Sequence, residues 1–149
     1  MFSFLRQMNI TSRCGNRFRE MRLADTGLSG CQIPYLFVLY RSPGLTQEEL
    51  SKALYINKSN VARQLLSLEK AGYIYRQGLE EDRRVLKVYP TEKALCVRDR
   101  IRSVQQEWMQ ILTEDFTQEE CEQLTSLMNR IAAKAETLMK EGDINASCR

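Results

Sequence analysis

The chain has 149 residues, which is long enough to bury one substantial core, so we expect a single domain over residues 1–149. Its hydrophobic content of 43% and charged content of 28% are those of an ordinary globular protein. No apolar run approaches the roughly 18 residues that a membrane span needs, and residues 1–5 lack the basic start of a signal peptide. We therefore expect a cytoplasmic protein without a membrane partner.

The residue types that most enzymes use are scarce. The chain has no histidine, which removes His metal ligands and His general bases. Its five cysteines are scattered and form no Cys-x-x-Cys pair. Glu80, Glu81 and Asp82 could be read as a metal site, but without a histidine nearby an exposed turn is favoured. We therefore expect no catalytic residues, no cofactor and no metal.

Two helices are predicted at the start of the chain. The first covers residues 3–24, and its apolar side holds Phe4, Leu5, Met8, Cys14, Phe18 and Met21. A turn over residues 25–27 ends it. The second follows Ser29, which forms a capping box with Gln32. Pro34 removes a backbone donor, so it should kink the first turn of this helix or delay its start.

Two short helices then follow in close succession. Thr46, with Glu49 three residues later, forms a capping box that opens the first of them. Asn57 is a candidate N-cap for the second, which can run to Ala71 with Gly72 as the glycine after its end. The tight break between them is typical of a helix-turn-helix.

The second of these helices has the properties of one that reads the major groove of DNA. Its buried stripe is predicted to be Val61, Leu65 and Leu68. Its outward face holds Ser59, Arg63, Ser67 and Lys70, flanked by Asn60 and Gln64. That face carries no acid and can donate hydrogen bonds to base edges and phosphates. From it we take the candidate DNA-binding residues Asn57, Lys58, Ser59, Asn60, Arg63 and Gln64. An ordinary solvated polar face is the alternative.

A β-hairpin is predicted next. Residues 74–76 and 85–89 have the β-branched and aromatic side chains of strands. Residues 78–84 between them form a charged loop of suitable length. A helix-turn-helix followed by such a hairpin is a winged helix.

Four charged residues of this hairpin are further candidates for DNA contact. Arg83 and Arg84 at its tip could reach into a minor groove. Asp82 could orient Arg84 through a bidentate pair. Arg76 on the first strand completes the set, and a solvated charged turn is the alternative.

Two long helices are predicted to close the chain. Thr91 caps the first, whose apolar residues are Leu95, Ile101, Val104, Trp108, Ile111 and Leu112. Its arginines at 98, 100 and 102 could face phosphates or pair with Asp99 and Glu107, although a solvated face is favoured. Thr117 and Glu120 form a capping box for the last helix, whose apolar residues are Leu124, Leu127, Met128, Ile131, Ala135 and Leu138. Residues 142–149 are expected to be a frayed tail.

The distribution of charge favours one nucleic-acid face. Residues 1–25 carry five basic and two acidic side chains, and residues 57–89 carry seven and four. Residues 114–149 carry four and eight. The apolar stripes of the terminal segments would leave too much apolar surface on a monomer. A two-fold homodimer would cover them and set two reading helices about 34–36 Å apart, facing a pseudo-palindromic duplex.

The order of these motifs resembles the MarR family of bacterial winged-helix regulators. The matching positions are Leu68-Glu69, Gly72, Ile74, Arg76, Asp82-x-Arg84 and Thr91-x-x-Ala94. Ala94 replaces the usual glycine, and Pro90 stands where the family often has leucine. The resemblance extends over nearly the whole chain in length and helix order, while its specific motifs lie between residues 45 and 95.

The resemblance implies a mainly α fold with a small β-hairpin wing, a winged helix-turn-helix with long N- and C-terminal dimerisation helices. Residues 29–91 would be the DNA-binding lobe, and residues 1–25 and 92–141 the helical dimerisation region. The implied function is that of a homodimeric, sequence-specific regulator that binds double-stranded DNA, a repressor associated with the nucleoid of the bacterial cytoplasm. The alternative is a winged-helix module that binds protein partners.

The resemblance also implies an effector. Family members commonly lose DNA affinity when a small aromatic ligand binds or an oxidant acts on a cysteine of the first helix. Cys14 lies near that position, with Tyr35 and Tyr40 as candidate partners. Arg13 and Arg17 would favour its thiolate. A small buried hydrophobe is the favoured alternative for Cys14, and also for Cys31, Cys96, Cys121 and Cys148.

Overall fold

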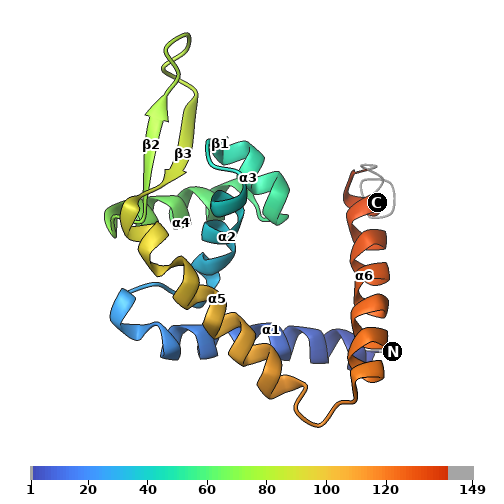
Figure 1. Cartoon of the computed structure of the whole chain (residues 1–149). Coiled ribbons are helices and arrows are strands. Elements are labelled where there is room, and N and C mark those ends of the chain that lie inside the picture. Colours follow the sequence, from blue (N-terminus) through green and yellow to red (C-terminus); the bar gives the residue numbers. More distant parts are fainter. Residues whose placement is uncertain (1, 141–149) are drawn as a thin grey trace. The chain divides into compact units, whose positions relative to one another are not determined.

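The computed structural model describes residues 2–140, and the side chains of residues 3–139. The chain divides into two compact units, Met1–Trp108 and Met109–Arg149. In chain order its elements are α1 (Phe2–Arg22), η1 (Ala24–Thr26), η2 (Gly30–Gln32), α2 (Ile33–Arg41), β1 (Leu45–Thr46), α3 (Gln47–Leu54), α4 (Lys58–Lys70), β2 (Ile74–Gly78), β3 (Leu86–Pro90), α5 (Glu92–Leu112) and α6 (Gln118–Lys140), as labelled in Figure 1. This confirms the predicted mainly α fold with a small winged sheet.

The start of α2 shows the predicted effect of Pro34. The capping box of Ser29 and Gln32 is present, but it opens the short 3₁₀ turn η2. The α-helix begins only at Ile33, with the proline in its first turn, where no backbone donor is needed. The delay that the sequence predicts is therefore confirmed.

The helix-turn-helix is formed by α3 and α4. The Thr46–Glu49 capping box is confirmed, because the backbone N–H of Glu49 donates to the Thr46 hydroxyl and that of Thr46 to the Glu49 carboxylate. Asn57 caps α4 as predicted, and Gly72 follows the helix with φ of +77°. The buried stripe of α4 is confirmed.

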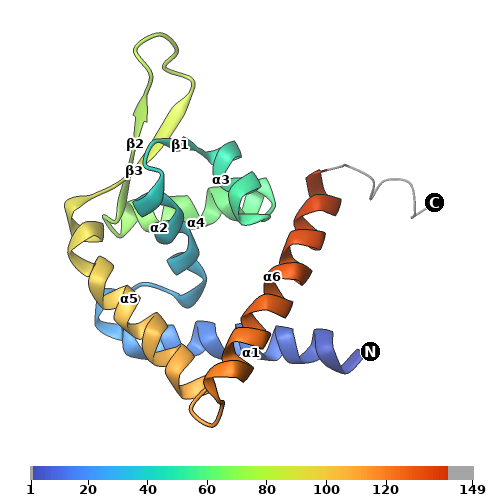
Figure 2. The ribbon, with the colours of Figure 1, turned by 45° about the vertical axis from the view of Figure 1, so that its right-hand side comes forward.

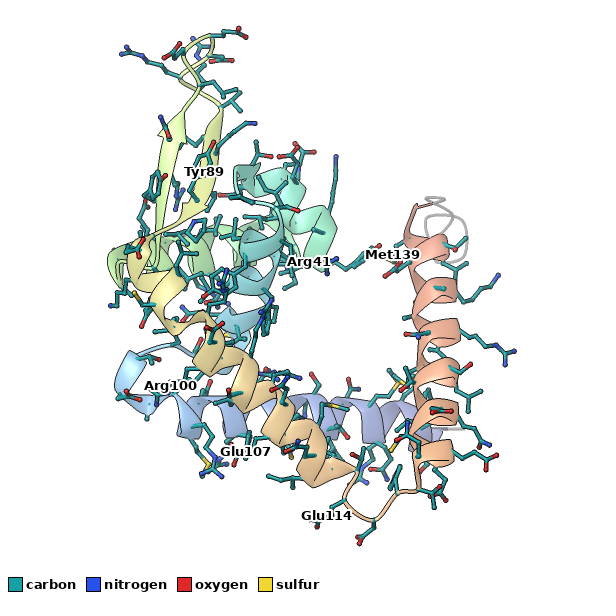
Figure 3. The ribbon with its side chains drawn as sticks, in the orientation of Figure 1. Arg41, Tyr89, Arg100, Glu107, Glu114 and Met139 are labelled. Atoms are coloured by element: carbon teal, nitrogen blue, oxygen red, sulfur yellow. The ribbon has the colours of Figure 1, made fainter. Side chains whose placement is uncertain are left out.

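The wing, residues 74–90, belongs to a three-stranded antiparallel sheet in the order β1-β3-β2. Tyr75 pairs with Tyr89, and their rings stack with centroids 5.4 Å apart (Figure 3 labels Tyr89). The two-residue strand β1 pairs with β3, and the sequence did not reveal it because so short a strand has no alternating pattern. Figures 1 and 2 both show the hairpin extending well beyond the helices of its own unit.

One hydrophobic core fills the first unit. It joins α2, α3, α4, the base of the wing and the first half of α5 through Leu36, Leu39, Leu50, Val61, Leu65, Leu68, Tyr73, Ile74, Val88, Ala94, Ile101 and Val104. Most of the predicted apolar side of α1 is exposed, and only Phe18 packs against this core. On α5, Leu95, Ile111 and Leu112 are also exposed.

Arg100 connects α5 to the end of α1 and to the residues that follow it. Arg100 donates two hydrogen bonds of 2.6 Å to the Asp25 carboxylate, which lowers the pKa of that carboxyl (Figure 3 labels Arg100). Arg98 lies 3.7 Å from Asp99, but Glu107 pairs with Arg22 rather than with an arginine of its own helix. Arg100 is exposed, as the favoured solvated face requires, and it also pairs with an acid from a distant part of the chain.

The second unit contains the last residues of α5, the turn that follows and α6. Thr117 and Glu120 form the predicted capping box. The apolar residues Leu124, Leu127, Ile131 and Leu138 of α6 are all exposed. Among residues 2–140, no helix is both long and apolar enough to span a bilayer. The predicted tail and Cys148 lie outside the described residues.

Candidate nucleic-acid interface

The N-terminus of α4 is organised by the side chain of Asn57. Its Oδ1 accepts hydrogen bonds from the backbone N–H of Asn60 at 2.8 Å and from the Ser59 hydroxyl at 2.9 Å. The side-chain oxygen of Asn57 is therefore used in the cap. Asn57 is exposed, so its amide NH2 group remains accessible. Asn57 shapes the start of the helix and leaves Ser59 exposed beside it.

Arg63 is held in place by a neighbour on the same helix. Its guanidinium donates a 3.0 Å hydrogen bond to Oδ1 of Asn60. Among the described residues, the remaining N–H groups of the exposed Arg63 have no hydrogen-bond partner, so they are available for an acceptor outside the chain. Gln64 is half-buried beside it. Arg63 is thus exposed, and Asn60 and Gln64, which the sequence predicts to flank the outward face, are half-buried.

Lys58 faces an acid that the sequence reasoning did not include. Its Nζ lies 3.7 Å from the Glu48 carboxylate, which also lies 3.3 Å from Lys52. The hydrogen bond from Lys52 and the charge of Lys58 lower the pKa of Glu48. All three side chains are largely exposed, so these pairs are weak and a phosphate could replace Glu48 as the partner of Lys58.

The wing tip differs from the prediction in one respect. Oδ1 of Asp82 accepts a 2.9 Å hydrogen bond from the backbone N–H of Arg84, and the carbonyl of Asp82 accepts from Val85 at 3.1 Å. No ion pair among the described residues joins the side chains of Asp82 and Arg84. The predicted bidentate pair is therefore wrong for this structure, because Asp82 uses its carboxylate to close the loop of its own backbone. Arg83 and Arg84 are both exposed.

Arg76 has a partner inside the lobe. Its Nε lies 3.2 Å from the Glu69 carboxylate, so it ties β2 to the end of α4, and its side chain is only 22% exposed. Arg76 and Arg84 also line a groove of about 330 Å³ between the start of α3 and the wing. The ion pair with Glu69 favours a structural role for Arg76. Arg63, Arg83 and Arg84 are exposed and are more available to bind phosphates.

Tyr55, in the turn between α3 and α4, was missed by the sequence reasoning. It has φ of 53° and ψ of 39°, the left-handed conformation, which costs an ordinary residue roughly 1–2 kcal/mol. Its side chain is about half exposed. A glycine or asparagine here would have signalled the turn, whereas a tyrosine gives no such signal.

Residues 26–85, which contain this helix-turn-helix and most of the wing, match the family model described as MarR family. Over 136 residues the chain is 27% identical to the uncharacterized HTH-type transcriptional regulator YybA of Bacillus subtilis (strain 168), and the match covers 91% of each chain. The MarR protein from Peptoclostridium difficile DA00132 has the same fold, with a TM-score of 0.86 and 26% identity over 94% of this chain and 92% of that one. Residues 26–85 are therefore similar to the MarR family, and nearly the whole chain has the fold of a solved MarR protein.

This match confirms the resemblance to the MarR family that the sequence motifs indicated. A mutant MarR from E. coli, solved in complex with operator DNA, shares this fold with a TM-score of 0.75 and 22% identity over 85% of this chain and 91% of that one. The family and the relatives above are named as transcriptional regulators, which are not enzymes.

The three candidate effector residues differ in their exposure and in their hydrogen-bond partners. Cys14 is exposed on α1, so the buried-hydrophobe alternative is wrong for it, as it is for the exposed Cys31 and Cys96. The Tyr40 hydroxyl donates a 2.7 Å hydrogen bond to the carbonyl of Ala94, and burial raises its pKa to about 12. No hydrogen bond within the described residues joins Cys14 to either tyrosine.

Tyr35 is the candidate effector residue whose hydroxyl is buried without a partner among the described residues. Its side chain is 1% exposed, and its hydroxyl has no hydrogen-bond partner within the described part of the chain. Burial, followed by the effect of nearby Cys31, raises the pKa of this hydroxyl, while Arg63 acts in the opposite direction.

Proposed function

We propose that this protein is a sequence-specific transcriptional regulator that binds double-stranded DNA through α4 and the wing. The observation that carries the proposal is the N-terminal half of α4. Its first turn contains no acid, a feature that it shares with α1 and α2, whereas α3, α5 and α6 each carry acids there. The positive end of the helix dipole, Lys58 and the exposed fork of Arg63 therefore face outward without a compensating charge on the helix. This combination suits phosphates and the acceptor edges of bases.

The wing supports the same proposal. Arg83 and Arg84 lie at the end of a hairpin that extends beyond the helices of its unit, where they could enter a minor groove (Figure 1). The E. coli MarR that shares this fold was solved with operator DNA. Glu80, Glu81 and Asp82 at the same tip would repel phosphates, so contact is expected through the arginines alone.

The active form in this proposal is a two-fold homodimer. Exposed apolar side chains occur on every helix outside the winged lobe: Phe4, Leu5 and Ile10 on α1, Met109, Ile111 and Leu112 on α5, and Leu124, Leu127, Ile131, Leu138 and Met139 on α6. Leaving these in water is unfavourable at about 25 cal/mol per Å² of apolar surface. A second copy would cover them and present two α4 helices to successive major grooves, about 34–36 Å apart.

The proposed response is repression that a small ligand or an oxidant relieves. The buried, unpartnered hydroxyl of Tyr35 supports a ligand, because a buried hydroxyl without a hydrogen bond is costly and a polar ligand atom would satisfy it. The exposed Cys14 and Cys31 support reaction with an oxidant.

Selection of bound duplexes from a random pool tests this function. The expected result is an enriched pseudo-palindrome whose half-sites lie one helical turn apart, bound by a species with the mass of two chains in analytical ultracentrifugation. If no sequence is enriched and the protein binds no duplex of any sequence, DNA binding is contradicted and the protein-partner alternative is favoured. The enriched duplex can then be retested with small aromatic acids and with peroxide.

A further inference from the structure

Apart from the tyrosines, Gln32 is the one buried polar side chain among the residues whose burial the structure describes. It is 5% exposed and lies in the short turn η2. Its amide oxygen accepts a 3.0 Å hydrogen bond from the backbone N–H of Ser29, and its amide nitrogen donates one of 3.0 Å to the hydroxyl of Ser67 on α4. Helical periodicity places Ser67 on the outward face of α4, yet its hydroxyl accepts a hydrogen bond from Gln32. One side chain thus connects the turn η2 to the helix proposed to read DNA.

The turn η2 is in turn fixed to α1. The backbone N–H of Gly30 donates a 3.1 Å hydrogen bond to the Glu20 carboxylate. A Cβ at Gly30 would collide with the backbone carbonyl of Asn16, so η2 lies against the backbone of α1 at a distance that only glycine permits. A continuous set of contacts therefore runs from α1 through η2 to α4.

We infer that Gln32 is a positioning residue that fixes where α4 lies relative to α1, and thereby sets the spacing between the two reading helices. The inference rests on the proposed function, in which α1 belongs to the dimerisation region and α4 reads DNA. In a two-fold dimer, a displacement of α4 from α1 occurs twice with opposite sense, so it changes the separation of the two α4 helices. Adjacent bases along one strand are about 3.4 Å apart, so a shift of an ångström or two at each end alters the match to a fixed half-site spacing.

Other contacts hold the rest of the lobe to the end of α1. The Tyr73 hydroxyl donates to the carbonyl of Thr26 at 2.7 Å, and Arg100 pairs with Asp25. These contacts reach the base of the wing and α5, and neither involves α4. Cutting the Gln32–Ser67 hydrogen bond should therefore loosen the link between η2 and α4, while the hydrophobic core still holds α4 in the lobe.

The test is Ser67→Ala, with Ser67→Thr as the variant that keeps the hydroxyl and Ser103→Ala as the matched control. Ser67 and Ser103 are both exposed helical residues, and alanine is a better helix former than serine, so both alanine variants are expected to fold. Ser67→Thr adds one methyl group at an exposed position and is expected to fold as well. Affinity is measured for duplexes whose two half-sites are separated by the optimal spacing or by one base pair more or less. A second readout is hydrogen exchange at the Ser29 and Gly30 amides, which the Gln32 and Glu20 side chains protect.

We expect Ser67→Ala to reduce the ratio of affinities for optimally spaced and misspaced duplexes by about fivefold. This is the change that the loss of one neutral hydrogen bond would cause. Its affinity for an unrelated duplex should not change, and exchange at Ser29 should accelerate. Ser67→Thr and Ser103→Ala should behave as the wild type. Unchanged spacing preference and exchange in Ser67→Ala, while the wild type discriminates spacing, would overturn this inference and leave the proposed function intact. A wild type that binds no duplex would overturn the proposed function and the role in spacing with it, whatever the exchange shows.

Discussion

The carboxylate of Asp82 accepts a 2.9 Å hydrogen bond from the backbone N–H of Arg84, so the acid shapes the loop that presents the arginine. Asp82→Ala removes the bond, whereas Asp82→Asn keeps an acceptor oxygen. We expect Asp82→Ala to weaken duplex binding by several-fold and Asp82→Asn to bind as well as the wild type or better, since it also removes a negative charge. Both should unfold at the same urea concentration within error, because the loop is exposed. Equal weakening by both substitutions would instead support a role for the charge of Asp82.

Tyr55 should be a site where glycine stabilises the protein. Its left-handed backbone conformation costs a tyrosine roughly 1–2 kcal/mol, while its half-exposed side chain contributes little burial. We expect Tyr55→Gly to raise the free energy of unfolding by up to about 1 kcal/mol in urea titrations, after the larger entropy of unfolded glycine is subtracted. The opposite substitution is the control. Gly72→Ala, at φ of +77° with no close neighbour beyond Lys93, should lower it by about 1 kcal/mol. A loss of stability in Tyr55→Gly would mean that the tyrosine ring makes contacts worth more than the strain.

Tyr40 should make stability depend on pH in alkali. Burial raises its pKa to about 12 in the folded protein, above the ordinary value of 10.0, and its hydroxyl donates to the carbonyl of Ala94. The neutral form is therefore favoured in the folded state. Its contribution is complete below pH 10 and is lost as the pH rises from about 10 to about 12. We expect the free energy of unfolding to fall over this window, and to fall less in Tyr40→Phe. That variant should also be less stable at neutral pH, by about 1–2 kcal/mol, because the Ala94 carbonyl loses its donor. Parallel pH profiles for the two proteins would contradict the assignment.

Gly30 and Gly27 should respond to alanine for different reasons. A Cβ at Gly30 would meet the backbone of Asn16, which cannot move without displacing α1. A Cβ at Gly27 would meet nothing within 4 Å, and only its φ of +70° opposes substitution. We expect Gly27→Ala to cost about 1 kcal/mol and Gly30→Ala about 3 kcal/mol or more, as measured by thermal or urea unfolding. Equal costs would show that η2 does not lie tightly against α1.

The elements that local hydrogen bonds define could be predicted from the sequence. Thr46 with Glu49, Asn57 with Asn60, and Thr117 with Glu120 each form their caps within three residues, so the helix starts follow from short motifs. The outward face of α4 followed in the same way from helical periodicity.

Features that depend on distant partners could not be predicted. The bond from Gln32 to Ser67 joins residues 35 apart in sequence, and the pair of Arg100 and Asp25 joins residues 75 apart. The two-residue strand β1 exists only because β3 offers it a partner. At the candidate interface the same limit applied to Arg76, since nothing local reveals that Glu69 engages it.

The slope of log affinity against log salt concentration tests DNA reading by α4 and the wing most directly. The enriched duplex would be titrated with the wild type, Arg63→Ala and Arg84→Ala, with Arg102→Ala, an exposed arginine on α5, as the control for loss of charge. We predict a steep slope for the wild type, reduced by about 1 for each arginine that contacts a phosphate. If Arg63 contacts a base, Arg63→Ala should relax sequence preference by about 1–3 kcal/mol. Arg102→Ala should match the wild type. A wild-type slope near zero, or equal effects of all three substitutions, would contradict the account.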